Sequence, residues 1–226
     1  MAASRAASPE SAGLQQSIKA LIVSGEFEMG ARISEDLLAE RFGTGRATVR
    51  HALTCLAAVG LVDVRPRIGT FVFSLDAEEF DQLNTVREVM ECAAIRIAMQ
   101  SNRQPFLSDL RKNVRKAAAL TFTSNYRQEY RMLDREFHRL PFKYANNHYL
   151  TEMYETIEIK IWTMRSLLTF PDTHYQASLD AHHSIAELLS EGQVELACQR
   201  VQTHIRASFS ARERNLLSAY PAHPSS

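Results

Sequence analysis

Apolar residues recur at steps of three and four along most of the chain, which is the spacing of one face of an α-helix. The spacing predicts a first helix over 9–24 and, after residue 76, six more helices near 77–101, 106–121, 124–145, 148–170, 174–190 and 193–218. The stretch 33–72 differs, because two short helical patterns are followed there by two stretches rich in β-branched residues. We predict a mainly α fold, in which a small mixed domain precedes an all-α antiparallel bundle of about six helices.

The first half of the stretch 33–72 contains signals that begin and end two helices. Ser34 is a suitable N-cap for the first helix, and Gly43 is a suitable residue to end it. Thr44 is expected to cap the second helix, which should end at Gly60.

The second half of this stretch predicts a β-hairpin. LVDV at 61–64 and TFVF at 70–73 have the composition of strands, and the turn between them contains proline and glycine. Two helices joined by a short glycine-containing turn and followed by a hairpin form a winged helix-turn-helix.

The second of these helices carries the residues that indicate DNA binding. Arg46 and Arg50 are four positions apart and therefore project from the same face. From Arg41 to Arg67 there are five arginines and one acidic residue, whereas the whole chain has a formal net charge of +0. Arginine can bind guanine O6 and N7 together, or a phosphate. A solvated helix face would show the same charges, but the helix-turn-helix order around them favours DNA binding.

Residues 14–72 resemble the DNA-binding domain of the GntR family of bacterial transcriptional regulators, in the stretches IKALIVSGEFEMGARISEDLLAERFG, GRATVRHAL and GLVDVRPRIGTFV. The resemblance implies that Arg46 and Arg50 make the main contacts with bases or phosphates. It also implies that Arg32 holds the DNA backbone and that Gly69 lets the tip of the wing approach the minor groove. Thr48 stands where the family commonly has proline, and its hydroxyl is a further candidate for a phosphate or base contact.

Length and composition are those of a chain with two domains. We expect a DNA-binding domain over 9–74, an all-α ligand-binding and dimerisation domain over 76–218, and disordered tails over 1–8 and 219–226. No apolar run approaches the ~18 residues of a membrane span, and the N-terminus lacks the apolar core of a signal peptide. Three widely spaced cysteines predict reduced thiols in a cytoplasmic protein: Cys55, Cys92 and Cys198.

Polar residues on the apolar faces of three predicted bundle helices indicate a metal site. Asp134 and His138 are four positions apart and share one face, while His182 and His204 lie at apolar spacings on two later helices. Burying a carboxylate and three imidazoles without a shared partner costs several kcal/mol, and a divalent ion removes that cost. Asp-x-x-x-His on one helix suits a metal site inside a bundle. The alternative is that each histidine is satisfied separately within the core.

Residues 80–210 resemble the FCD effector domain of the FadR branch of the GntR family. The matching features occur in the order Arg87-x-x-x-Glu91, Asp134-x-x-x-His138, His182-x-x-Ile185 and His204. The resemblance implies a bundle of six or seven helices, in which the aspartate and the three histidines bind zinc, nickel or a similar divalent ion. It also implies that a small carboxylate effector binds beside that ion.

Two arginines are candidates for binding the carboxylate, because guanidinium and carboxylate groups form paired hydrogen bonds. Arg87 can serve in this way or form a salt bridge with Glu91 four positions later, and the sequence leaves both alternatives open. Arg165 is a weaker candidate for the same pocket.

We therefore expect a ligand-responsive bacterial transcriptional regulator and not an enzyme. As a homodimer it would bind an inverted-repeat operator in double-stranded DNA, and the effector would change its operator affinity. The alternatives are a metal-dependent enzyme with a DNA-binding appendage and a dedicated metal sensor. Against the enzyme, the sequence has no zincin motif, no nucleophile elbow and no evident general base beside the proposed ligands.

Overall fold

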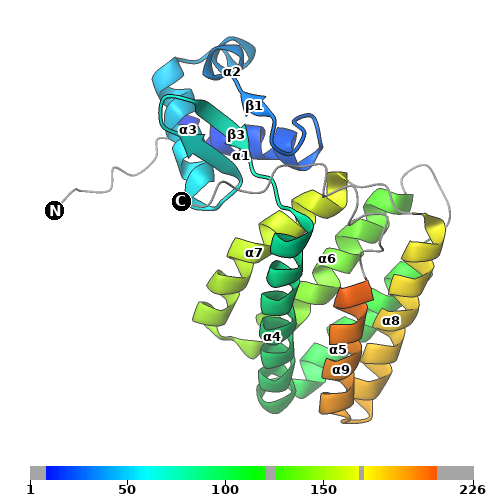
Figure 1. The fold of residues 1–226 in the computed structure, drawn as a ribbon. Helices are drawn as coiled ribbons and strands as arrows, with labels where there is room; N and C mark the ends of the chain where they lie inside the picture. Colours follow the sequence, from blue (N-terminus) through cyan, green and yellow to red (C-terminus); the bar gives the residue numbers. More distant parts are fainter. Residues whose placement is uncertain (1–8, 121–125, 168–170, 208–226) are drawn as a thin grey trace. The chain divides into compact units, whose positions relative to one another are not determined.

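The structure is a computed structural model that describes residues 9–120, 126–167 and 171–207 (Figure 1). The chain divides after Asp76 into two compact units, which are described separately below. Helix α7 is shared, since its residues up to Ile157 belong to the second unit and those from Glu158 belong to the first. The predicted tails over 1–8 and 219–226 lie outside the described residues. None of the helices within the described ranges is long and apolar enough to cross a membrane.

The first unit confirms the predicted winged helix-turn-helix. Its elements are α1 Pro9–Val23, β1 Arg32–Ile33, α2 Glu35–Phe42, α3 Arg46–Ala58, β2 Val62–Arg65 and β3 Gly69–Val72. Helices α1 and α3 pack together, and α2 packs against α3. The core of this unit is built from buried aliphatic residues, among them Ile18, Ile22, Leu38, Val49, Leu53, Leu56 and Leu61.

The predicted N-cap of α3 is wrong by one residue. Ser34 caps α2 as expected, accepting a hydrogen bond from the Leu37 amide, and Gly43 ends that helix in the left-handed conformation. The amide of Thr44 donates to the Ala39 carbonyl and thereby completes the C-terminal cap of α2. Gly45 is therefore the N-cap of α3, and it provides no side-chain hydrogen bond.

The wing is a three-stranded antiparallel sheet in the order β1-β3-β2. Both predicted hairpin strands exist, each displaced by one residue from its predicted range. Strand β1 was not predicted, because two residues are too few to show an alternating pattern. Gly69 pairs with Arg65 and has a φ of 136°, a conformation that residues with a side chain rarely adopt.

The second unit contains the bundle helices α4 Ala77–Ser101, α5 Arg103–Ala118, α6 Tyr126–Ala145, α8 Asp172–Ser190 and α9 Val194–Ala207, together with the part of α7 His148–Leu167 up to Ile157. All six were predicted, but α5 begins three residues earlier than its predicted start. Pro105 lies in its first turn, where a missing amide hydrogen costs nothing. Helix α6 continues to Ala145 beyond Pro141. The predicted extensions over 121–125, 168–170 and 208–218 lie outside the described residues.

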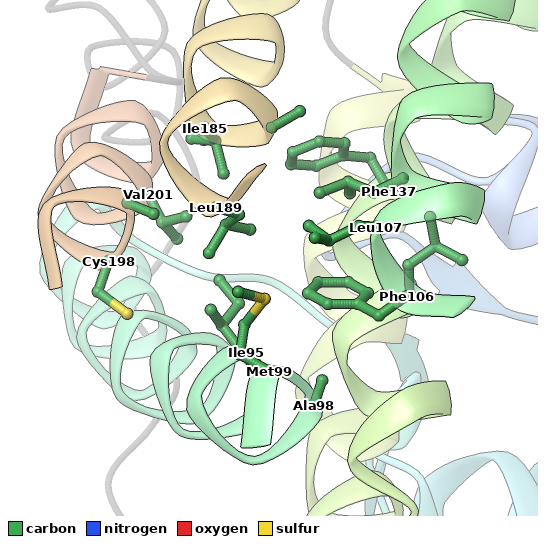
Figure 2. Packing of buried hydrophobic residues seen from close by; sticks show 14 of the residues in the cluster. Ile95, Ala98, Met99, Phe106, Leu107, Phe137, Ile185, Leu189, Cys198 and Val201 are labelled. Carbon is green, nitrogen blue, oxygen red and sulfur yellow. The ribbon is translucent and has the colours of Figure 1, made fainter. Parts of the chain in front are cut away.

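The bundle core joins side chains from α4, α5, α6, α8 and α9. Figure 2 shows Ile95, Phe106, Phe137, Leu189 and Val201 converging from these helices into one buried cluster. Two of the cysteines, Cys92 and Cys198, are buried in the same cluster, and all three cysteines are free thiols. The interior of the bundle is thus filled with apolar groups, which makes the buried polar residues beside it conspicuous.

Candidate functional site

Four buried polar side chains of the bundle converge on one point. Helix α6 contributes Asp134 and His138, α8 contributes His182, and α9 contributes His204. Each offers one ligand atom, and these four atoms lie within 4.8 Å of one another. The residues are between 2% and 5% exposed. The structure therefore brings together all four residues that the sequence predicted as metal ligands.

The distances within this cluster leave imidazole nitrogens facing one another. His204 Nε2 lies 3.2 Å from His182 Nε2 and 3.3 Å from His138 Nε2, and His182 Nε2 lies 3.7 Å from Asp134 Oδ1. A neutral imidazole has one N–H and one lone pair, so the N–H of one ring can point to only one neighbour. The two close contacts share His204 Nε2, so one N–H cannot satisfy both, whereas a cation between the nitrogens would bind the lone pairs of all three rings.

This spacing fits a divalent metal ion. Zinc–nitrogen bonds are about 2.0–2.1 Å long, so two nitrogens bound at angles near 90–110° lie roughly 2.9–3.4 Å apart. Both short Nε2–Nε2 distances fall within that interval. Imidazole nitrogens with one carboxylate oxygen form a ligand set that zinc and nickel accept. The packing also restrains the rings, since His182 stacks on Phe137 with their centroids 3.8 Å apart.

The buried carboxylate of Glu91 binds the Nδ1 side of the His138 ring, opposite the nitrogen that faces the cluster. Glu91 Oε2 lies 2.7 Å from His138 Nδ1, so this carboxylate accepts the hydrogen bond from Nδ1–H, and in the neutral ring Nε2 is then the acceptor. Arg87 Nε and the Tyr154 hydroxyl both donate to Glu91 Oε1, at 2.6 Å and 3.0 Å. Burial alone would raise the pKa of Glu91, but His138 and Arg87 outweigh it and lower that pKa to about 2. Glu91 therefore stays ionised as a support for the cluster.

The structure contains the salt bridge between Arg87 and Glu91, which is one of the two alternatives for this arginine. The Arg87 guanidinium is buried and its Nε donates to Glu91, so it supports the carboxylate that holds His138, while its role in effector binding remains a prediction. Burial lowers the pKa of Arg87, but the charge of Glu91 outweighs this effect and raises it above its usual value. Arg165 is buried in the part of α7 that belongs to the first unit, and its role remains a prediction.

A cavity of about 140 Å³ opens onto the cluster from between α8 and α9. Its lining residues are His174, Ala177, Ser178, Ala181, Arg200, His204 and Ala207. Ser178 Oγ donates to Asp134 Oδ1 at 3.3 Å, which connects the wall of the cavity to the cluster. Arg200 is not among the residues predicted from the sequence, although its spacing of four residues from His204 places both on one face of α9.

The predicted DNA-contacting arginines lie on the exposed part of α3. The side chains of Arg46 and Arg50 are 70% and 68% exposed. Both are engaged by acidic residues of α2, since Arg46 Nε lies 2.6 Å from Asp36 and Arg50 Nη2 lies 2.8 Å from Glu35. The hydrogen bonds to Glu35 raise the pKa of Arg50. The basic face expected from the sequence is therefore balanced by carboxylates from outside it.

The other three predicted contact residues occupy different positions in the first unit. Thr48 is half-buried and lies two residues from each arginine, so it does not share their face of α3. Arg32 is exposed on β1. A side chain on Gly69 would approach Arg32 Nε to 2.9 Å, so the glycine leaves room for that arginine.

Two family models together cover most of the chain. The model described as "FCD domain" matches residues 82–207, and the model described as "Bacterial regulatory proteins, gntR family" matches residues 11–72. The boundary between the two matches agrees with the division of the structure after Asp76.

Individual relatives agree with these matches. Over 187 residues the chain is 27% identical to the uncharacterized HTH-type transcriptional regulator YdhC of Bacillus subtilis (strain 168), covering 83% of this chain and 84% of that protein. Over 166 residues it is 25% identical to the gluconate operon transcriptional repressor of Bacillus licheniformis, covering 71% and 68%. The crystal structure of a GntR regulator from Rhodococcus sp. RHA1 shares the fold, with a TM-score of 0.72, 23% identity and coverage of 95% and 100%.

Proposed function

The chain belongs to the GntR family of bacterial regulatory proteins and carries an FCD domain, and from this premise we propose that it is a metal-dependent, ligand-responsive regulator of transcription. The GntR domain implies DNA binding. The names of the relatives indicate a transcriptional regulator and not an enzyme. The observation that carries the proposal is the convergence of three imidazole nitrogens and one carboxylate oxygen in the bundle.

In this proposal Asp134, His138, His182 and His204 hold one divalent ion, either zinc or nickel. The ion would act as a Lewis acid that attracts an anionic ligand. Glu91 would keep His138 in the tautomer that presents Nε2, as carboxylates commonly do for ligating histidines. The apolar surroundings would exclude water from the ligands, since the whole cluster is buried.

We place the effector in the cavity between α8 and α9. The volume of about 140 Å³ is well below the roughly 300–1,000 Å³ of pockets for drug-sized ligands, so it favours a small molecule. Arg200 in the cavity wall offers a guanidinium group that can pair with a carboxylate. Arg200 is thus a further candidate, beside Arg87 and Arg165, for the arginine that binds the effector.

Removal of the metal should weaken effector binding. We expect a small carboxylate to bind the metal-loaded protein at least about tenfold more tightly than the chelator-treated protein, because charge-assisted contacts to the ion are lost. Calorimetric titration of both forms with acetate, succinate, malate and citrate measures this difference. Arg200→Gln should also weaken binding, whereas Arg206→Gln, which removes the same charge from a residue paired with Glu88, should not.

Equal affinities of the two forms for every carboxylate that binds would contradict the metal-assisted site. If the metal-loaded protein binds none of them but metal itself changes DNA affinity, the chain is a metal sensor and the effector proposal is wrong.

We further propose that the regulator is a homodimer on an inverted-repeat operator. One winged helix-turn-helix contacts only one half-site of the operator. Two such domains related by a twofold axis contact both half-sites and double the number of DNA contacts. The helical unit exposes several large apolar side chains suited to an interface, including Val86, Val89, Met132, Tyr149 and Met153. Sedimentation velocity of the purified protein should give twice the chain mass of 25.6 kDa. A monomer that persists in the presence of operator DNA would contradict the dimer.

A further inference from the structure

The DNA-reading arginines are paired with carboxylates that come from outside the arginine-rich segment 41–67. Among the described residues, four of its five arginines form ion pairs, namely Arg41 with Glu26, Arg46 with Asp36, Arg50 with Glu35 and Arg65 with Asp63. The two pairs on the recognition helix use adjacent residues of the first turn of α2. Asp36 therefore engages Arg46 and Glu35 engages Arg50, so each predicted base-contacting arginine has one carboxylate.

The contact between Arg50 and Glu35 occupies only one edge of the guanidinium. Arg50 Nε lies 3.2 Å from both carboxylate oxygens of Glu35, and Nη2 lies 2.8 Å from Oε2. A guanidinium has five donors in a planar fork, so the edge formed by Nη1 and Nη2 remains available. Two donors on that edge can bind guanine O6 and N7 together.

We propose that Glu35 and Asp36 are specificity-determining residues, which rests on the proposed DNA-binding function. They orient Arg50 and Arg46 toward bases and offset their positive charge. Guanine O6 and N7 are neutral acceptors, so an arginine can bind them while it remains paired with Glu35 or Asp36. A phosphate is an anion that competes with the carboxylate and is repelled by it. The two acids therefore disfavour non-specific binding to the backbone more than they disfavour base recognition.

The test compares affinities for two DNA duplexes of equal length at fixed salt. One duplex is selected by the wild-type protein from a random pool, and the other is its shuffled sequence; both are measured by fluorescence anisotropy. The variant Glu35→Gln/Asp36→Asn should bind the shuffled duplex about 3- to 10-fold more tightly than the wild-type protein does. Its affinity for the selected duplex should increase by a smaller factor. The specificity ratio should therefore fall, and each single substitution should give part of the effect.

The matched control is Glu40→Gln, which removes one negative charge from an exposed position of the same helix. Glu40 has no ion pair with an arginine in the described part of the chain, so its loss should change both affinities by the same small factor. The inference is overturned if the double variant behaves like Glu40→Gln, leaves both affinities unchanged, or loses affinity for both duplexes equally. If the wild-type protein binds neither duplex, the DNA-binding function itself is wrong and the inference fails with it.

Discussion

His204→Ala should reduce the metal content of the purified protein from one divalent ion per chain to a small fraction of one. The substitution removes the imidazole whose Nε2 lies within 3.3 Å of both other histidine nitrogens, so it deletes the central ligand of the cluster. Elemental analysis by mass spectrometry measures the loss. The melting temperature should fall as well, because an ion that binds only the folded state stabilises it by mass action.

His183→Ala is the matched control for this prediction. His183 is adjacent to a proposed ligand, but its side chain is 62% exposed and lies beside Glu187 on the surface of α8. This variant should keep the full metal content, whereas Glu91→Gln should keep the site but weaken its affinity about 10- to 100-fold. Because imidazole must be neutral to bind metal, affinity should decrease as the pH is lowered. Equal metal loss in the His183 and His204 variants would contradict the proposed ligand set.

Arg50→Ala should weaken binding to the selected DNA duplex about 10- to 100-fold if this side chain reads a base. The side chain is exposed on the recognition helix, where it presents a free edge of its guanidinium. Fluorescence anisotropy at fixed salt measures the effect. Affinity for a shuffled duplex should change much less, since one phosphate contact accounts for a small part of non-specific binding.

Two further variants separate base reading from charge. Arg50→Lys keeps the positive charge and loses the planar fork, so it should retain non-specific affinity and lose affinity for the selected duplex. Arg115→Ala removes the same charge from an exposed position on α5 of the helical unit and should leave both affinities unchanged. Unchanged affinity for the selected duplex in both Arg46→Ala and Arg50→Ala would contradict the assignment of α3 as the recognition helix.

Helical periodicity was sufficient to predict both the bundle and the four residues of the cluster. A residue on the apolar face of a regular helix must point inward, and the i, i+4 spacing of Asp134 and His138 allows no other arrangement than a shared face. The same reasoning placed His182 and His204 inside the bundle, where both are buried. Periodicity does not reveal that the four residues lie at the same height along the bundle axis. Their height depends on how helices α6, α8 and α9 pack against one another.

Interactions between distant segments leave no local pattern in the sequence. The local charge count over 41–67 predicted a basic face, but Glu35 and Asp36 lie in the preceding helix and neutralise it. Sequence spacing allows Arg87 to pair with Glu91, but it cannot show that His138 and Tyr154 from other helices join the same carboxylate. The cap of α3 was misplaced because the amide of Thr44 already serves the end of α2.

The central claim is that a ligand of the helical domain controls DNA binding, and operator affinity at saturating effector tests it most directly. The metal-loaded protein is titrated against the selected duplex by fluorescence anisotropy, with and without the carboxylate that binds most tightly in calorimetry. A regulator of this kind should change its DNA affinity by about 5- to 150-fold, the usual range of coupling between two sites. The same titration with His204→Ala should show no response to the carboxylate. An identical DNA affinity of the metal-loaded wild-type protein with and without bound carboxylate would contradict the claim.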